Sequence, residues 1–225
     1  MDDRYHNAMM ARRAMARRVP GEFMLVNYLE NPDGAYINTL YKHHSGTRYI
    51  VNVRNSLYST TGGRLLGFGN TGYTGTKLAM FFKMANATTT TQHTASFWLG
   101  EAVGSTVTIR TGGKNGRFTV ELDATNGAPR GYVDGAEVVS GTNSYAYNYN
   151  VNLFCTHPSA STDSFFLDRM YWCRMIYRGS LARDFVPVVR LSDGKPGLYD
   201  LCGSTSNLTN SPFYISANTK EFTWG

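Results

Sequence analysis

From Glu22 onward, apolar and polar residues tend to alternate with a period of two, which is the pattern of half-buried β-strands. Turn sequences such as Asn31–Gly34 and Asp134–Gly135 separate these runs. The pattern predicts strands at 23–29, 35–41, 47–55, 77–85, 94–101, 106–111, 117–123, 151–155, 167–177 and 185–190, with a compact hairpin at 132–138. Many short strands at this spacing indicate a sandwich or barrel.

A different pattern precedes the strands. Residues 7–18 read NAMMARRAMARR, in which strong helix formers place apolar residues at helical spacing. We therefore predict a basic helix and hinge over residues 1–21 and one β-domain over 22–225. A helix of this length is marginal alone in water, so the segment is either a frayed tail or a docking element. The candidate docking residues are Met10, Arg12, Arg13, Ala14, Arg17 and Arg18.

The charge is concentrated at the N-terminus. The chain carries a formal +6, and residues 1–18 hold five arginines against two aspartates. A nucleic-acid-binding domain spreads basic residues over its folded part, so we expect no nucleic-acid partner. No stretch reaches the ~20 apolar residues of a membrane span, and arginine pairs interrupt the N-terminal apolar residues that a secretory signal needs. We expect no membrane partner and no export leader.

The sequence motifs do not indicate a cofactor or a metal. Cys155, Cys173 and Cys202 form no CxxC pair, and the first two lie in apolar runs, which favours buried free thiols. The motifs of phosphate loops, zinc hydrolases, serine hydrolases and calcium loops are absent from the sequence. His43 and His44 are adjacent, and on a strand they would point to opposite faces, so we expect a polar loop pair.

Three segments carry a family resemblance: NYLENPDGAYINT at 27–39, GYVDGAEV at 131–138 after VELD at 120–123, and 167–201 with RDFVP and GLYD. On these residues the chain resembles the concanavalin A-like lectin/glucanase superfamily. It is most similar to laminin-G-like jelly-roll modules of gut bacterial surface proteins and phage virion proteins. The resemblance spans about 22–225, loosely over 56–118. It implies an all-β, two-sheet antiparallel jelly-roll β-sandwich, here with a short N-terminal α-helix.

Because that superfamily includes glycoside hydrolases, the carboxylates decide whether catalysis is expected. The catalytic members resemble one another through a Glu-x-Asp-x-x-Glu strand, and their reaction needs two carboxylates about 5–5.5 Å apart. The matching residues here are Glu121 and Asp123, and Asn126 stands at the third acidic position. We therefore expect no enzymatic activity, with Glu121 and Asp123 on the solvent face of a strand.

Sugar recognition commonly uses flat aromatic rings and planar amides, and residues 143–152 (NSYAYNYNVN) are rich in both. On a strand, the tyrosines and Val151 share one face and the asparagines share the other. Tyrosines beside Val151 favour a core face with a solvated asparagine face, while a glycan site is the alternative. The candidate glycan-binding residues are Trp98, Tyr147, Asn148 and Asn150.

The basic segment 1–18, called the leader from here on, is followed by a proline hinge at 19–21 and by the jelly roll. Together these parts resemble small phage virion proteins. This resemblance implies a non-enzymatic structural, decoration or fibre-type protein that is assembled in the host cytoplasm. We expect a homo-oligomer whose helix docks onto other virion proteins and whose jelly roll is displayed on the particle, with a host surface glycan as a further partner. The alternative is a carbohydrate-binding, lectin-like module at a bacterial cell surface.

Overall fold

The computed structural model describes residues 18–55, 65–67, 92–97, 106–111, 116–125, 128–141, 150–155 and 165–225. All regular elements in these ranges are β-strands. The described ranges contain no helix with the length and apolar character needed to cross a membrane. The predicted helix at 7–18 lies outside them except for Arg18.

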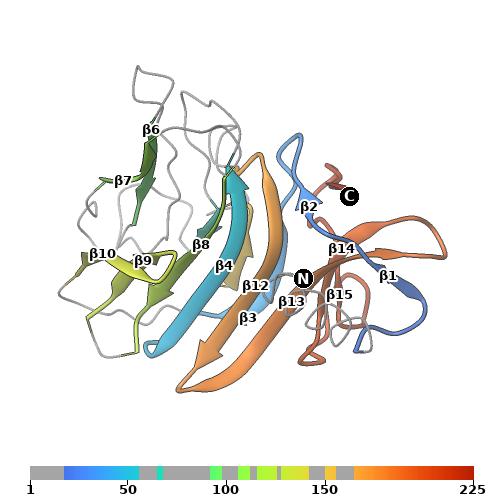
Figure 1. The fold of residues 1–225 in the computed structure, drawn as a ribbon. Helices are drawn as coiled ribbons and strands as arrows, with labels where there is room; N and C mark the ends of the chain where they lie inside the picture. Colours follow the sequence, from blue (N-terminus) through green and yellow to red (C-terminus); the bar gives the residue numbers. More distant parts are fainter. Residues whose placement is uncertain are drawn as a thin grey trace, which may run out of the picture.

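One large antiparallel sheet dominates the molecule (Figure 1). Its main path runs through β10 (Ala136–Ser140), β9 (Arg130–Val133), β8 (Gly116–Asp123), β4 (Thr47–Asn55), β12 (Arg169–Tyr177), β13 (Ser180–Arg190), β14 (Pro196–Asp200) and β15 (Phe213–Tyr214). Three short strands join this sheet at its side. β1 (Phe23–Leu25) pairs with β13, and β2 (Leu29–Glu30) pairs with both β12 and β16 (Thr223–Trp224).

A smaller antiparallel sheet packs against one face of the large sheet. It contains β3 (Ile37–Lys42), β11 (Asn150–Leu153) and β5 (Leu66–Gly67), and β6 (Gln92–Ser96) pairs separately with β7 (Thr106–Thr111). Alternate residues of β4 point into the space between the sheets, where Val51 and Val53 share one core cluster with Ile37, Val151 and Leu153. All five side chains are fully buried. The prediction of an all-β antiparallel protein is therefore confirmed.

A second, smaller apolar cluster lies on the opposite face of β13–β15. Phe23 of β1 packs there against Val186, Val188 and Phe213, with ring centroids of Phe23 and Phe213 4.9 Å apart. Arg18 precedes this cluster, and its guanidinium lies 3.5 Å from the carboxylate of Asp184. Residues 18–25 therefore cover part of the outer face of the large sheet.

Several predicted strands agree with the structure, and one does not. The strands at 47–55 and 106–111 are observed with the predicted bounds, and Asp134 and Gly135 form the predicted turn with positive φ angles of 47° and 82°. The strand predicted at 23–29 is wrong, because the chain changes partner within it. The amides of Asn27 and Tyr28 both donate to the carbonyl of Gly225, which separates β1 from β2. The strand predicted at 77–85 lies outside the described residues.

Candidate functional site

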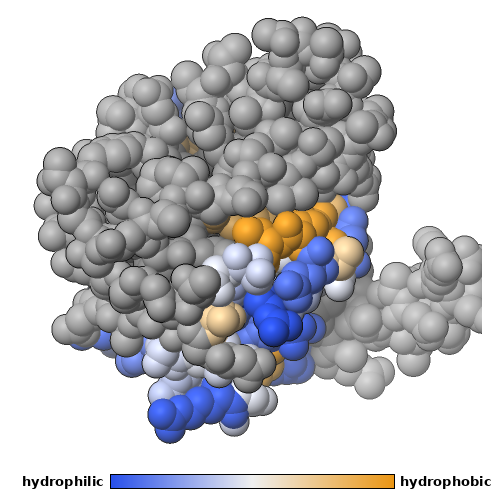
Figure 2. Space-filling view, turned by 90° about the vertical axis from the view of Figure 1, so that its left-hand side faces the viewer, coloured by the Kyte–Doolittle hydropathy of each residue, from blue (hydrophilic) through white to orange (hydrophobic). Residues whose placement is uncertain are grey.

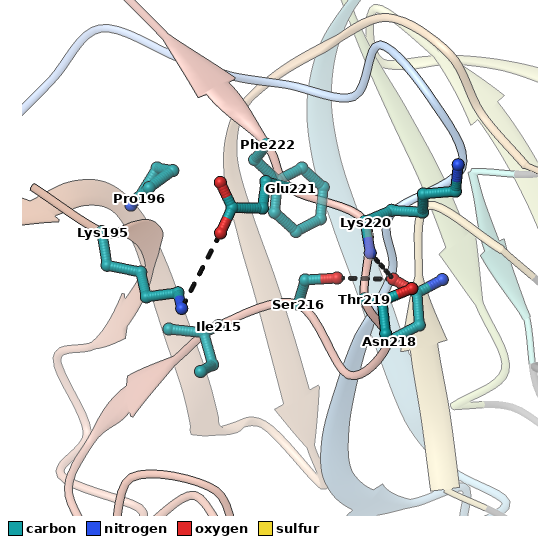
Figure 3. Close-up of a pocket in the computed structure, with 9 residues that line it drawn as sticks. All are labelled: Lys195, Pro196, Ile215, Ser216, Asn218, Thr219, Lys220, Glu221 and Phe222. Carbon is teal, nitrogen blue, oxygen red and sulfur yellow. Dashed lines mark hydrogen bonds and ion pairs between the residues drawn. The ribbon is translucent and has the colours of Figure 1, made fainter.

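A cavity of about 160 Å³ opens where the turn between β13 and β14 meets the loop between β15 and β16 (Figure 3). Both sides of this cavity come from the C-terminal part of the chain. The lining residues are Lys195, Pro196, Ile215, Ser216, Asn218, Thr219, Lys220, Glu221 and Phe222. They combine hydroxyl, amide, ammonium and carboxylate groups with apolar side chains.

Hydrogen bonds to the β2–β3 loop hold the wall of this cavity in place. The amide of Ala217 donates to the carbonyl of Tyr36 at 2.8 Å, and the side chain of Asn218 donates to the carbonyl of Gly34 at 2.9 Å. The ammonium of Lys220 lies 2.5 Å from the carboxylate of Asp33. Three contacts to one loop fix the position of a segment that has no regular secondary structure.

The β2–β3 loop is itself rigid because Asn31 is buried within it. Its side-chain nitrogen donates to the carbonyls of Ala35 and Phe166 at 2.8 and 2.9 Å, and its side-chain oxygen accepts the amide of Ala35 at 2.8 Å. Asparagine suits such a turn because its short amide pairs with the backbone in both directions. The Asn-Pro-Asp-Gly turn predicted from the sequence therefore supports the cavity wall.

The apolar side of the cavity is anchored in the main core. Phe222 is buried and packs on Phe154, with 4.8 Å between ring centroids. Ile215 belongs to the second apolar cluster, and Pro196 begins β14. The cavity therefore has an apolar surface at a fixed position, against which the non-polar face of a small ligand can pack.

Two charged side chains face each other across the cavity. The ammonium of Lys195 lies 3.8 Å from a carboxylate oxygen of Glu221; the Lys195 side chain is half-buried and that of Glu221 is exposed. Figure 3 shows the two groups pointing toward one another, whereas the Lys220 side chain extends away from them. The hydroxyl of Ser216 donates to the side-chain oxygen of Asn218 at 2.8 Å, so its lone pairs can accept further hydrogen bonds. This arrangement can bind a small molecule that carries hydroxyl groups.

The outer face of the large sheet offers a contrasting set of aromatic rings. The guanidinium of Arg117 lies 4.0 Å from the ring centre of Tyr171, and that of Arg169 lies 3.9 Å from the ring centre of Tyr28. The two tyrosine rings meet edge to face at 6.0 Å. Because a guanidinium covers one face of each ring, these tyrosines are less suited to stacking on a sugar than bare rings.

Figure 2 views the molecule from the β10 side of the sheet and shows hydrophobic residues gathered in the middle of that side, with hydrophilic residues below them. On β10, Val138 and Val139 are partly buried and pack against the main core. Arg130 and Glu137 form an exposed ion pair of 3.3 Å beside them. The described residues of β9 and β10 therefore have structural contacts within the sandwich.

The structure places only some of the residues predicted to be functional. Trp98, Tyr147 and Asn148 lie outside the described residues, while Asn150 begins β11, is half-buried and pairs with Lys42. The asparagine face of β11 differs from the expectation in one respect. Asn152 is 6% exposed rather than solvated, and none of the described residues forms a hydrogen bond with its side-chain oxygen. Val151 lies in the core, as expected for that face.

The predicted docking residues Met10, Arg12, Arg13, Ala14 and Arg17 also lie outside the described residues. Arg18 is described, and besides Asp184 it contacts the carbonyl of Leu201, to which its guanidinium donates at 3.2 Å. Arg18 therefore holds the beginning of the described chain against β13 and against the residue that follows β14.

The carboxylates of the Glu-x-Asp motif are engaged in local contacts. The guanidinium of Arg48 donates two hydrogen bonds to Glu121, at 2.5 and 2.8 Å. The carboxylate of Asp123 accepts the amide and the hydroxyl of Thr125 at 2.9 and 2.6 Å. Glu121 therefore pairs with a cation, and Asp123 accepts hydrogen bonds from a residue that follows its strand.

The histidines and cysteines have different environments. The ring of His43 is buried and lies 2.6 Å from the hydroxyl of Tyr49, whereas His44 is exposed, so the expected polar loop pair is only half correct. Cys155 and Cys173 are buried thiols that form no disulfide with a described cysteine, as predicted. Burial raises the pKa of Cys202 to about 11, with smaller contributions from two aspartates. No group of three or more metal-ligating side chains occurs within the described ranges.

None of the residues that line the cavity was predicted from the sequence. They come from a strand end and a loop, where no periodic pattern marks them. One signal was present: the segment Ile215–Phe222 is rich in short polar residues between apolar ones. Its folding partners, Asp33–Tyr36, are about 180 residues away in the sequence, so their proximity could not be read from spacing.

Comparisons with known proteins find a similar fold among solved structures. No family model matches the sequence, and no curated protein matches it. Among solved structures, the chain is similar to one from Bacteroides ovatus that carries the name "putative carbohydrate binding protein", with a TM-score of 0.51 and 11% sequence identity. The match covers 89% of this chain and 60% of the other, so this chain spans about 60% of the length of that structure. The likeness supports a β-sandwich fold.

Proposed function

We propose that this protein is a non-catalytic carbohydrate-binding module with a jelly-roll β-sandwich, and that the cavity at Lys195 and Glu221 binds a sugar residue. The observation that carries the proposal is the chemistry of that cavity. Ligand sites typically place a few converging polar groups beside an apolar surface. Here Ser216, Glu221 and Lys195 supply the polar groups, and Phe222 with Ile215 supplies the apolar surface.

The fold gives independent support. A solved structure with the same kind of sandwich is named for carbohydrate binding. The jelly-roll topology and membership of the concanavalin A-like superfamily remain part of the proposal, resting on the sequence resemblance at 27–39, 131–138 and 167–201. Loops at one end of a rigid sandwich are also where binding residues commonly lie.

The carboxylates favour binding over hydrolysis. Most glycoside hydrolases need a pair of carboxyl groups beside the scissile bond, one as the acid and one as the base or nucleophile. Among the described residues that line the cavity, Glu221 is the single acidic one. Glu121 and Asp123 are hydrogen-bonded to Arg48 and Thr125, respectively. We therefore propose that the protein holds its ligand without cleaving it.

The lectin-like role takes precedence over the virion role. The virion prediction depends on the N-terminal leader, whose residues 1–17 lie outside the described ranges, and none of the comparisons supports it. Display at a cell surface and display on a particle are both compatible with a sugar-binding domain. We propose the cell-surface, carbohydrate-binding role as the main function and retain attachment through the leader as a separate prediction.

The test is a glycan array followed by isothermal titration calorimetry with the full chain. We expect binding to at least one glycan, and we expect the double variant Lys195→Ala/Glu221→Ala to lose about ten-fold or more in affinity, because charge-assisted hydrogen bonds contribute about 1.5–3 kcal/mol. The matched control is Arg130→Ala/Glu137→Ala, which removes an exposed ion pair from the far side of the sheet. Equal affinity of the cavity variant and the control, or a folded protein that binds no glycan, would contradict the proposal.

A further inference from the structure

We infer that the cavity selects a neutral sugar residue with adjacent hydroxyl groups and discriminates against both acidic and amino sugars. This inference rests on the proposed function and names the ligand class of the same site. It follows from the balance of charge among the groups that point into the cavity. One ammonium, on Lys195, and one carboxylate, on Glu221, face each other there.

The second lysine of the lining does not disturb this balance. The ammonium of Lys220 is held by Asp33 at 2.5 Å, and its side chain extends away from Lys195 and Glu221 in Figure 3. The backbone amide of Lys220 donates to the side-chain oxygen of Asn218 at 3.1 Å, which fixes the residue in this orientation. A ligand in the cavity therefore meets one positive and one negative group.

The ion pair between these groups is loose enough to be shared with a ligand. Its 3.8 Å separation is longer than a direct charge-assisted hydrogen bond, and the two side chains are 42% and 72% exposed. Exposed pairs of this kind contribute little to folding, so moving the two groups apart costs little. The hydroxyl groups of a sugar can then accept from the ammonium and donate to the carboxylate.

A charged sugar is attracted by one of the two groups and repelled by the other. The carboxylate of a uronic acid is attracted by Lys195 and repelled by Glu221, and the ammonium of an amino sugar meets the reverse. A neutral polyol uses both groups without repulsion, since hydroxyls donate and accept. Two carboxylate oxygens beside each other also match two neighbouring hydroxyl donors, as they match the paired donors of arginine.

The volume of the cavity agrees with the binding of one sugar residue. A volume of about 160 Å³ is below the range of roughly 300–1,000 Å³ that is typical of drug-sized ligands. Phe222 is buried, so the apolar surface that the cavity offers to a sugar comes mainly from the half-buried side chains of Ile215 and Pro196. The unit bound here is therefore expected to be one residue of a longer chain or its end.

The experiment compares glucose, galactose and mannose with their uronic acids and with glucosamine and galactosamine, by NMR titration of the full chain. We expect the wild type to bind a neutral sugar about ten-fold more tightly than its charged counterparts. A charged sugar replaces one charge-assisted hydrogen bond by the repulsion between two like charges. We expect Glu221→Gln to shift the preference toward uronic acids and Lys195→Gln to shift it toward amino sugars. Arg130→Gln and Glu137→Gln, which change an exposed ion pair away from the cavity, are the matched controls and should leave the preference unchanged.

The outcomes separate this inference from the proposed function. A wild type that binds sugars but prefers a uronic acid or an amino sugar overturns the inference and leaves carbohydrate binding intact. The same conclusion follows if Glu221→Gln and Lys195→Gln do not move the preference in opposite directions. A folded wild type that binds none of these sugars, nor any glycan of the array, overturns both. Amide resonances that shift at Ser216 and Thr219 on titration would place a bound sugar in the cavity.

Discussion

Asp200 has four polar contacts in the C-terminal part of the fold. It is fully buried, and one carboxylate oxygen accepts the amides of Asp184 and Cys202 at 2.9 and 3.0 Å. The other oxygen accepts the hydroxyl of Ser204 and lies 3.6 Å from the guanidinium of Arg183. A buried carboxylate is tolerated only with such partners, so this residue links β13, β14 and the turn after β14.

The substitution Asp200→Asn tests this role. It removes the charge and turns one acceptor into a donor that faces the hydroxyl of Ser204 and the guanidinium of Arg183. We expect the free energy of unfolding to fall by about 2–4 kcal/mol, because a buried cation loses its partner. Urea denaturation followed by tryptophan fluorescence measures this change.

A carboxylate on the surface provides the control for Asp200. Asp193 is exposed, and hydrogen bonds from Arg190 are the main reason that its pKa is lowered to about 2. Asp193 is therefore ionised at neutral pH, and Asp193→Asn removes one negative charge from an exposed position. We expect the urea midpoint of Asp193→Asn to stay close to that of the wild type. Similar losses in the two variants would show that Asp200 has no special structural role.

The strands that the sequence predicted well are those whose residue pattern can be recognised within the strand and its flanking turns. β7 was predicted with its observed bounds because it alternates over most of its length, and β4 because the loop that ends at Gly46 marks its start. β13 was predicted from 185 onward, yet it begins at Ser180, since Arg178 and Gly179 form a tight turn with positive φ angles of 48° and 80°. Arginine is not a usual residue for such a turn, so the signal was hidden. β15 and β16 have two residues each, which is too short for a periodic pattern.

The pairing of β14 with β15 depends on a glycine. A Cβ added at Gly197 would overlap the carbonyl oxygen of Tyr214 and the ring of Phe213. We expect Gly197→Ala to destabilise the fold by about 3 kcal/mol or more, since backbone atoms cannot move aside as a side chain can. The same variant should weaken sugar binding, because Pro196 and Ile215 of the cavity flank this contact.

Thermal denaturation and calorimetric titration measure the two effects of Gly197→Ala. The control is Gly179→Ala, where φ is +80° and no atom lies within 4 Å of the added Cβ, so that only backbone strain of about 1–2 kcal/mol is expected. If Gly197→Ala is no more destabilising than Gly179→Ala, the close approach of β14 and β15 is not a constraint on the fold.

At the scale of the whole molecule, the fold class was within reach of the sequence and the cavity was not. Fold class follows from many short strands, each of which adds to the same conclusion. The cavity depends on Lys195 and Glu221, which are ordinary surface residues in sequence terms and meet only because the C-terminal loop is tied to Gly34 and Asp33. Contacts between distant loops leave no local pattern, so a site assembled from them requires the structure.

The way the chain enters the domain permits a separate test of the leader. Deleting residues 1–17 keeps Arg18 with its contact to Asp184, and it keeps β1. Deleting residues 1–25 also removes Phe23, which uncovers Val186 and Val188 on the outer face of the sheet. We expect the longer deletion to lower the melting temperature more than the shorter one, since loss of a buried Phe side chain alone costs about 3–5 kcal/mol.

The two deletions also separate attachment from folding. If the leader serves for docking or self-association, the shorter deletion should retain the melting temperature and sugar affinity of the full chain while its mass in solution, measured by light scattering, falls to that of a smaller assembly. An unchanged mass would remove self-association from the roles of the leader. A shorter deletion that unfolds the domain would instead make residues 1–17 part of the fold, because Arg18 and β1 would then be insufficient to cover the outer face of β13.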